Sequence, residues 1–153
     1  RPCDLGGIAR AAAERLRPQA EDAGIGLDVA PAGDPLPVEA DPDRIAQVVT
    51  NLVGNALRAT PAGGRITVGA WRDRGFALVT VSDTGVGLAP DDLERVFERF
   101  YRVGSRAGES GSGIGLTISR GIARAHGGDV TAASAGPGLG ARFTLALPLR
   151  NQA

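Results

Sequence analysis

The sequence predicts an α+β domain, and three observations support that class. Residues 41–60 repeat apolar side chains at the spacing of an α-helix. Residues 65–72 and 76–83 alternate with period 2 on either side of a short turn, which predicts an antiparallel hairpin. Residues 129–134 and 141–148 follow as two further strand candidates. The 153 residues suffice for one domain with a substantial core.

Composition excludes several kinds of binding surface, motif and cross-link. The chain has 17 basic and 17 acidic residues, so its charge indicates no nucleic-acid surface. Every basic residue is an arginine, and the absence of lysine rules out a GxxxxGK[ST] phosphate loop. Cys3 is the single cysteine, which leaves no disulfide framework. No apolar run approaches the ~18 residues of a membrane span, so a cytoplasmic setting without membrane contact is expected.

The N-terminal part is expected to hold one helix and two short strands. Residues 5–22 carry a modest apolar face at helical spacing, and Gly24 is a plausible end for this helix. Residues 25–30 alternate as a strand does, and residues 38–40 are a second strand candidate. The sequence PAGDPLP between them predicts a turn.

The long helix over residues 41–60 has a clear start. Asp41 is expected as its N-cap and Pro42 as its first helical residue, where a missing N–H has no cost. The sequence TPAGG that follows must turn before the hairpin. Within the hairpin, Trp71 is expected to have an ordinary packing role.

Polar side chains interrupt the apolar surface of this helix. Gln47, Asn51 and Asn55 recur every four residues, and Arg58 follows one turn later, so all four share one edge. An unpaired buried amide costs ~1–3 kcal/mol, so the amides need partners. They either bond to each other and to neighbouring backbone, or present their oxygens to a hard cation while Arg58 meets an anion.

In DTGVGL, residues 83–88, an acid ends an apolar strand and two glycines follow. A half-buried carboxylate at Asp83 needs a partner, and the sequence offers no basic neighbour. The exocyclic amino group of a ligand would supply a donor, while Gly85 and Gly87 let the backbone approach a flat base. The alternative is a plain turn with an N-capping aspartate.

In GSGIGL, residues 111–116, glycines open a helix whose free N–H groups attract phosphate. It is no Rossmann motif, because no apolar strand precedes it. The alternative is a hinge without a ligand. Upstream, FERFYR places Phe97 in the expected core, and Arg99 and Arg102 near a terminal phosphate.

Taken in order, NLVGNALRAT, DTGVGL, FERFYR and GSGIGL resemble the N, G1, F and G2 boxes of the catalytic, ATP-binding domain of sensor histidine kinases. The resemblance covers nearly the whole chain and includes AHGGDV and GARFTLALP. It implies one catalytic domain over residues 1–153 with the Bergerat fold of the GHKL superfamily. That fold is a two-layer α/β sandwich, with a mixed, mostly antiparallel sheet and helices on one face. ATP and Mg²⁺ are the implied cofactors, under a lid at about residues 102–112.

The resemblance assigns roles to individual residues. It makes Asn55 the magnesium ligand and Asn51 a supporting or polarising group, while Arg58 takes a place usually held by lysine near the phosphates. Asp83 would receive the adenine amino group, and Ala59 stands where an aromatic residue is usual. The implied catalytic residues are Asn51, Asn55, Arg58 and Arg102. The implied nucleotide-binding residues are Asn51, Asn55, Arg58, Asp83, Gly85, Gly87, Leu88, Tyr101, Arg102, Gly111, Ser112, Gly113, Ile114, Gly115 and Leu116.

The expected activity is that of a protein-histidine kinase domain in a two-component system. It would transfer the γ-phosphoryl group of MgATP to a histidine on a separate dimerisation and phosphoacceptor domain. The resemblance also implies a response regulator as partner of a membrane-anchored parent, and a monomeric domain in isolation. His126, the single histidine, is expected to be structural. The alternatives are an ATP-driven clamp of the gyrase and chaperone kind, which carries Glu where this chain has Asn51, and a module that binds ATP without transfer.

Overall fold

The computed structural model describes residues 1–98 and 115–150. One layer is a five-stranded sheet in the order β2-β4-β5-β7-β6. The β2–β4 pair is parallel and the other pairs are antiparallel. The class predicted from the sequence, α+β with a mixed and mostly antiparallel sheet, is therefore confirmed. The five strands are β2 (Gly26–Val29), β4 (Arg65–Asp73), β5 (Phe76–Asp83), β6 (Asp129–Ala133) and β7 (Ala141–Pro148).

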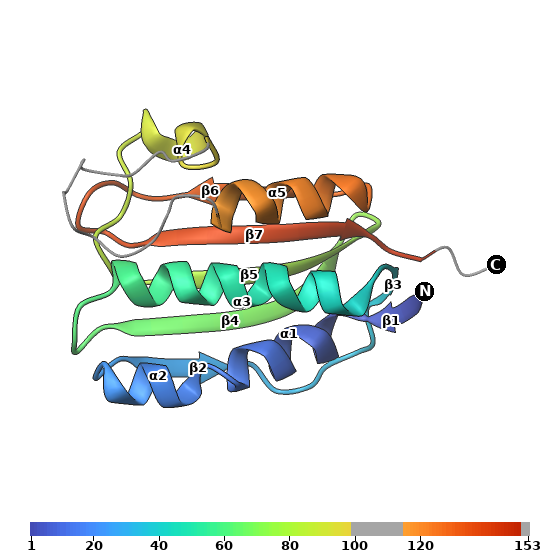
Figure 1. Ribbon diagram of the computed structural model, residues 1–153, viewed down its shortest axis with the longest axis horizontal. Helices are drawn as coiled ribbons and strands as arrows, with labels where there is room; N and C mark the ends of the chain where they lie inside the picture. The colour runs from blue at the N-terminus through green and yellow to red at the C-terminus, as the bar shows by residue number, and fades with distance from the viewer. Residues whose placement is uncertain (99–114, 151–153) are drawn as a thin grey trace.

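The second layer is helical and covers one face of the sheet (Figure 1). Its three main helices are α1 (Leu5–Glu14), α3 (Pro42–Ala59) and α5 (Gly115–Ala125), with α3 in the middle. The short helices α2 (Arg17–Asp22) and α4 (Asp92–Arg95) lie at the margins. In the part of the chain that is described, none of the helices combines the length and apolar content needed to cross a bilayer.

The central helix α3 forms as its sequence predicts. The side chain of Asp41 accepts hydrogen bonds from the N–H groups of Asp43 and Arg44, at 3.0 and 3.4 Å, and Pro42 is the first helical residue. The apolar stripe faces the core, where each of its members is at most 1 % exposed: Ile45, Val48, Val49, Leu52, Val53 and Ala56. This burial is the main hydrophobic contribution of α3 to the fold.

The single helix predicted over residues 5–22 is wrong, because the structure breaks it into α1 and α2. The break precedes Pro18, which lies in the first turn of α2. A proline inside a continuous helix would remove one backbone hydrogen bond, and its ring would clash with the carbonyl of Glu14. A new helix start at this point avoids both costs.

The chain also forms a second, two-stranded sheet from β1 (Pro2–Asp4) and β3 (Pro37–Glu39). The second of these strands matches the predicted strand near residue 38, whereas β1 was not foreseen. Asp4 joins this sheet to α1, because its Oδ1 accepts hydrogen bonds from the N–H groups of Gly6 and Leu36.

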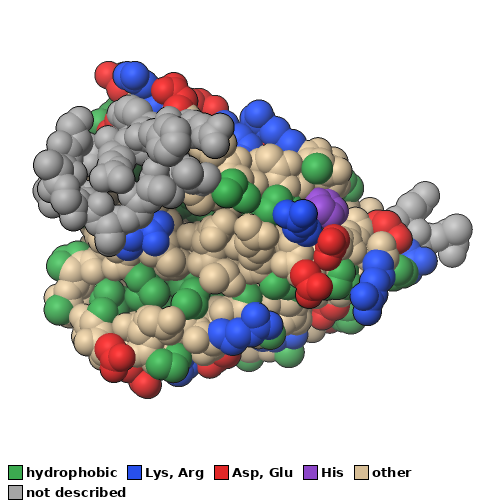
Figure 2. Space-filling model, in the orientation of Figure 1, with side chains coloured by type: hydrophobic (Ala, Val, Ile, Leu, Met, Phe, Trp, Pro, Cys, Tyr) green, Lys and Arg blue, Asp and Glu red, His purple; other side chains and the backbone are tan. Residues whose placement is uncertain are grey.

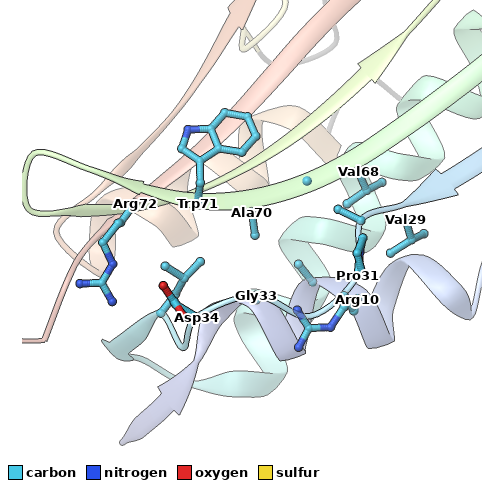
Figure 3. Close-up of a pocket in the computed structure, with 14 residues that line it drawn as sticks. Arg10, Val29, Pro31, Gly33, Asp34, Val68, Ala70, Trp71 and Arg72 are labelled. Carbon is cyan, nitrogen blue, oxygen red and sulfur yellow. The ribbon is translucent and has the colours of Figure 1, made fainter.

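Trp71, which was expected to have an ordinary packing role, lies at the surface, where its side chain is 46 % exposed. Figure 3 shows Trp71 on the opposite side of β4 from Ala70 and Arg72. Period-2 alternation gives β4 two faces, and Trp71 lies on the face without helices. Its ring lies across Gly69, 3.2 Å from the position a Cβ there would take.

Candidate functional site

Three of the predicted site segments meet at one end of the fold. The C-terminal end of α3, the end of β5 and the start of α5 all lie there (Figure 1). Arg58, Asp83 and Gly115 are therefore brought to the same end of the molecule. The antiparallel arrangement of α3 and α5 on the sheet produces this convergence.

Asp83 is the most distinctive residue of this end. It is 8 % exposed, and its Oδ1 accepts hydrogen bonds from the N–H groups of Gly85 at 2.9 Å and Ala141 at 3.3 Å. Its other oxygen, Oδ2, is buried and has no hydrogen-bond partner among the described residues. Burial raises the pKa of Asp83, and the two backbone hydrogen bonds oppose that rise. A buried acceptor of this kind fits a ligand that brings an N–H donor.

The loop after Asp83 is held between two other segments. Val86 donates its N–H to the carbonyl of Ala59 at the end of α3. On the other side, Gly138 donates to the carbonyl of Val86, and the hydroxyl of Ser134 accepts the N–H of Leu88. Leu88 itself is buried. The β6–β7 loop is thus part of the site wall, a role that the sequence did not indicate.

Gly85 and Gly87 have a structural reason to be glycine. A Cβ at Gly85 would overlap the carbonyl oxygen of Ala59. Gly87 has φ +70°, and a Cβ there would overlap the carbonyl oxygen of Gly136. The predicted approach of this backbone to a flat base stays a prediction, but close approach to protein backbone is already present.

We expect Gly85→Ala to lower the free energy of unfolding by about 1–3 kcal/mol, because its neighbour is backbone that cannot move aside. Gly121→Ala is the matched control, since a Cβ there meets nothing within 4 Å inside α5. That change should raise stability by ~0.5–1 kcal/mol. Urea denaturation of both variants measures the difference, and equal stabilities would contradict the overlap.

Asn51 connects α3 to α5. Its Nδ2 donates to the hydroxyl of Ser119 at 3.2 Å and to the carbonyl of Gly115 at 3.4 Å. These two bonds use the nitrogen of the amide, so its oxygen stays available for another partner. The sequence left two alternatives for this amide, bonding to neighbouring groups or presenting its oxygen to a cation. The geometry of Asn51 is compatible with both, because its nitrogen makes the bonds and its oxygen stays available.

Asn55 and Arg58 are less engaged than Asn51. The side chain of Asn55 is partly exposed and makes no hydrogen bond to any other described residue. Arg58 is exposed on the last turn of α3, with its guanidinium folded back toward Gly54. Ala59 is half-buried, and its backbone carbonyl, not its side chain, contacts the loop after Asp83.

Only part of the predicted phosphate turn is described. Gly115 is the first residue of α5, and Leu116 is half-buried against the core. Six other predicted nucleotide-binding residues lie outside the described residues: Tyr101, Arg102, Gly111, Ser112, Gly113 and Ile114. Arg99 and the predicted lid at 102–112 also lie outside them.

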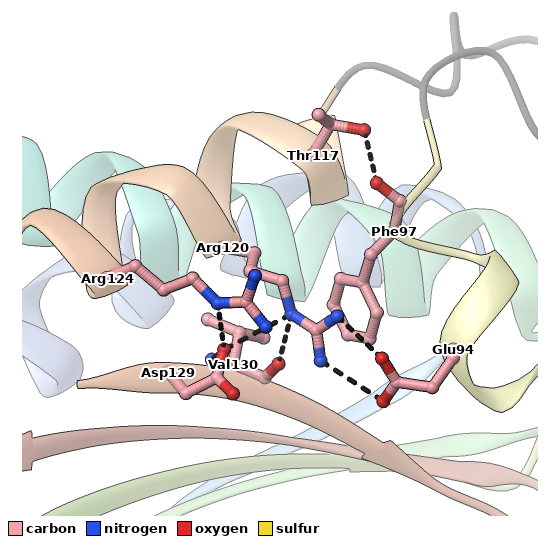
Figure 4. Close-up of polar contacts among 7 residues, drawn as sticks. All are labelled: Glu94, Phe97, Thr117, Arg120, Arg124, Asp129 and Val130. Atoms are coloured by element: carbon pink, nitrogen blue, oxygen red, sulfur yellow. Dashed lines mark hydrogen bonds and ion pairs between the residues drawn. The ribbon is translucent and has the colours of Figure 1, made fainter.

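Helix α5 carries a polar cluster that the sequence did not indicate (Figure 4). Arg120 binds both carboxylate oxygens of Glu94, at 2.8 and 3.3 Å, and its Nε donates to the carbonyl of Val130 at 3.0 Å. Its guanidinium also lies over the ring of Phe97, 3.7 Å from the centroid. Phe97 is buried, which confirms its expected core position. Thr117 donates to the carbonyl of Phe97 at 2.7 Å.

A pocket of about 270 Å³ lies elsewhere, between α1, the loop after β2 and the far part of β4 (Figure 3). Because β2 ends at Val29, β4 continues past Val68 without a partner on that edge, which leaves the hollow. Arg72 donates to the carbonyl of Pro35 at its rim. None of the predicted site residues lines this pocket, so it is distinct from the site at Asp83.

His126 lies at the opposite end of the fold from Asp83. It follows α5, and the single histidine of the chain is visible at the surface in Figure 2. Its Nε2 accepts the N–H of Asp41 at 3.2 Å, and its Nδ1 lies 2.8 Å from the carbonyl of Ile122. These contacts require a ring with the proton on Nδ1, which ties the end of α5 to the start of α3.

Sequence comparison identifies relatives of one kind. Residues 40–151 match the family model of histidine kinase-, DNA gyrase B- and HSP90-like ATPases. The histidine protein kinase DivJ of Caulobacter vibrioides is 41% identical over 142 residues, which are 92% of this chain and 23% of DivJ. The sensor histidine kinase WalK of Bacillus subtilis is 38% identical over 119 residues, 75% of this chain and 19% of WalK. The chain thus spans about a quarter of these relatives or less.

Solved structures agree with these relatives. The mycobacterial sensor histidine kinase MprB superposes with a TM-score of 0.84 at 29% identity, covering 99% of this chain and 100% of that one. Full-length ShkA in complex with AMPPNP gives a TM-score of 0.85 at 33% identity, covering 100% of this chain and 32% of ShkA. The chain therefore belongs to the histidine kinase-, DNA gyrase B- and HSP90-like ATPase family, as a catalytic domain of the sensor histidine kinase type.

Proposed function

We propose that this chain binds MgATP and transfers its γ-phosphoryl group to a histidine on a separate dimerisation and phosphoacceptor domain of the same kinase. The observation that carries the proposal is the buried Oδ2 of Asp83, which has no hydrogen-bond partner among the described residues. An adenine amino group would donate to this oxygen and relieve the cost of its burial. The similar ShkA structure is a complex with AMPPNP, which supports nucleotide binding by this chain.

The residues present fit a magnesium ion. Amide oxygens are among the hard donors that Mg²⁺ accepts, and Asn55 has no competing hydrogen bond among the described residues. Asn55 would hold the ion, with the free oxygen of Asn51 one turn away on the same edge of α3. Bound there, the ion would neutralise charge on the phosphates during transfer. Arg58 would add positive charge at the end of the helix.

The same residues favour transfer over hydrolysis. Phosphoryl transfer needs positioning and charge stabilisation more than covalent chemistry from the protein. Asn51 stands where the clamp ATPases carry glutamate, and an amide cannot take a proton from water at neutral pH. A water molecule would therefore lack a base at this position. The proposal also includes three expectations carried over from the family. These are a response regulator as partner, a lid over residues 102–112 and the role of Arg102.

Labelled ATP tests this proposal. The domain alone should bind ATP but release phosphate very slowly, and label should appear on protein only after the histidine-bearing domain of the parent kinase is added. Rapid phosphate release by the domain alone would favour an ATP-driven clamp. Binding without transfer to its own acceptor domain would favour a module that only binds.

His126→Ala is the matching control within the chain. The variant loses the acceptor for the N–H of Asp41, so the free energy of unfolding should fall by ~1 kcal/mol. Transfer to the acceptor domain should stay at the wild-type rate, because His126 lies at the far end of the fold. Stable label on His126 of the wild-type domain would contradict its structural role.

A further inference from the structure

We infer that Arg120 is a positioning residue of the nucleotide site, which fixes the first turns of α5 relative to residues 92–98. The inference rests on the proposed function, because it concerns how the site is held in place. Arg120 touches none of the residues expected to contact the nucleotide in the described structure, so its effect must pass through its neighbours.

The contacts of Arg120 join three parts of the fold. Its side chain is only 11 % exposed and binds Glu94 of α4 with both terminal nitrogens. The Nε hydrogen bond to the carbonyl of Val130 fixes the same guanidinium to β6, and the ring of Phe97 stacks beneath it (Figure 4). A planar, forked cation satisfies all of these contacts together, which an ammonium group cannot do.

The segment that Arg120 holds has little order of its own. Helix α4 has only four residues and none of them is fully buried, and its N-cap Asp91 makes no side-chain cap bond. A helix this short has no independent stability, so its place depends on contacts from outside. The hydrogen bond from Arg120 is the main cause that lowers the pKa of Glu94, so the pair is ionised at neutral pH.

Neighbours of Arg120 on α5 connect its position to that of the site residues. Thr117 holds the carbonyl of Phe97, so the same short segment is fixed twice. Ser119 is fully buried and accepts the amide of Asn51, which also donates to Gly115. The first turns of α5 therefore connect the α4 segment on one side with Asn51 on the other. A shift of α5 relative to α4 would displace groups expected to meet the phosphates.

Arg124 provides a matched control. It lies one turn further along α5, is 58 % exposed, and forms an ion pair at 3.1 Å with Asp129, which Arg120 also reaches at 3.2 Å. Neither α4 nor Phe97 contacts it among the interactions of the described residues. Exchange of arginine for lysine removes the guanidinium at both positions. Only at Arg120 does this exchange remove the link to α4.

The test compares Arg120→Lys, Arg124→Lys and Ile45→Val in the intact domain. Ile45 is fully buried near the other end of α3, so its change lowers stability without touching the Arg120 contacts. Calorimetry should show affinity for an ATP analogue about tenfold weaker in Arg120→Lys and unchanged in the two controls. In transfer to the acceptor domain, KM for ATP should rise by more than kcat falls.

Two results would overturn the inference. Wild-type affinity in Arg120→Lys would show that its contacts do not position the site. An equal loss of affinity in Ile45→Val, at a similar loss of stability, would show that the effect is merely structural. If the wild-type domain itself fails to bind the analogue, the proposed function fails. The wild-type measurement thus tests the proposed function, and the comparison of variants tests the role of Arg120.

Discussion

Asn55→Ala is expected to reduce phosphoryl transfer by at least about a hundredfold while leaving the fold intact, since one alanine removes the metal ligand. The side chain is partly exposed and makes no hydrogen bond to another described residue, so truncation removes no structural contact. Alanine is also the better helix former, and the free energy of unfolding should rise by a few tenths of a kcal/mol or stay the same. Opposite effects on activity and stability would identify a functional residue.

The control for this prediction is Gln47→Ala, which removes an exposed amide two turns earlier on the same edge of α3. It should leave transfer unchanged. Rates of label transfer, measured across a series of Mg²⁺ concentrations, compare the two variants. Transfer by Asn55→Ala within a few-fold of wild type at every concentration would exclude it as the metal ligand. Asn51 is a poorer test, because its loss would also break the contact with Ser119.

The elements that the sequence predicts well are those whose signals are local. Helix α3 follows from the spacing of its apolar residues and from the cap at Asp41, and both signals lie within the helix itself. The β4–β5 hairpin follows from period-2 alternation around a turn. In that turn, Arg74 adopts φ +51°, a conformation that its residue type does not suggest.

Apart from the break before Pro18, the features that the sequence did not predict have tertiary causes. Alternation in β4 shows that two faces exist, but only the packing of the helices decides which face Trp71 occupies. Pro18 was a local signal for the break between α1 and α2. The prediction of one helix over residues 5–22 gave more weight to the apolar spacing, and it was wrong. Strand β1 has three residues, and its pairing with β3 is set by residues more than thirty positions away.

The candidate site divides in the same way. Burial of Asp83 was predictable, because it ends an apolar strand. Its hydrogen bond from Ala141 was not, since that residue lies 58 positions later. Arg120 was overlooked because its partner Glu94 lies 26 residues earlier in the chain. The local sequence around Arg120 shows only an arginine on a helix, and that signal names no partner.

Asp83→Asn separates ligand binding from stability, because the two should move in different directions. The amide oxygen keeps the hydrogen bonds from Gly85 and Ala141, so the loop conformation is preserved. Burial raises the pKa of Asp83 in the folded domain, so the ionised carboxylate lowers stability at neutral pH without nucleotide. That loss is recovered as the pH falls through the raised folded-state value. The variant should therefore be at least as stable as wild type at neutral pH, and its advantage should shrink toward acid pH.

Nucleotide binding should respond in the opposite way. In Asp83→Asn the buried Oδ2, which lacks a partner among the described residues, becomes an amide nitrogen, so a donor would face the adenine amino group. Loss of a hydrogen bond to a charged acceptor costs ~1.5–3 kcal/mol, which corresponds to affinity about ten- to a hundredfold weaker. Calorimetry with an ATP analogue, alongside thermal unfolding from neutral to acid pH without nucleotide, measures both effects. Unchanged affinity would remove Asp83 from the adenine site, whereas a variant with weak binding and an unstable fold would show that the carboxylate is structural.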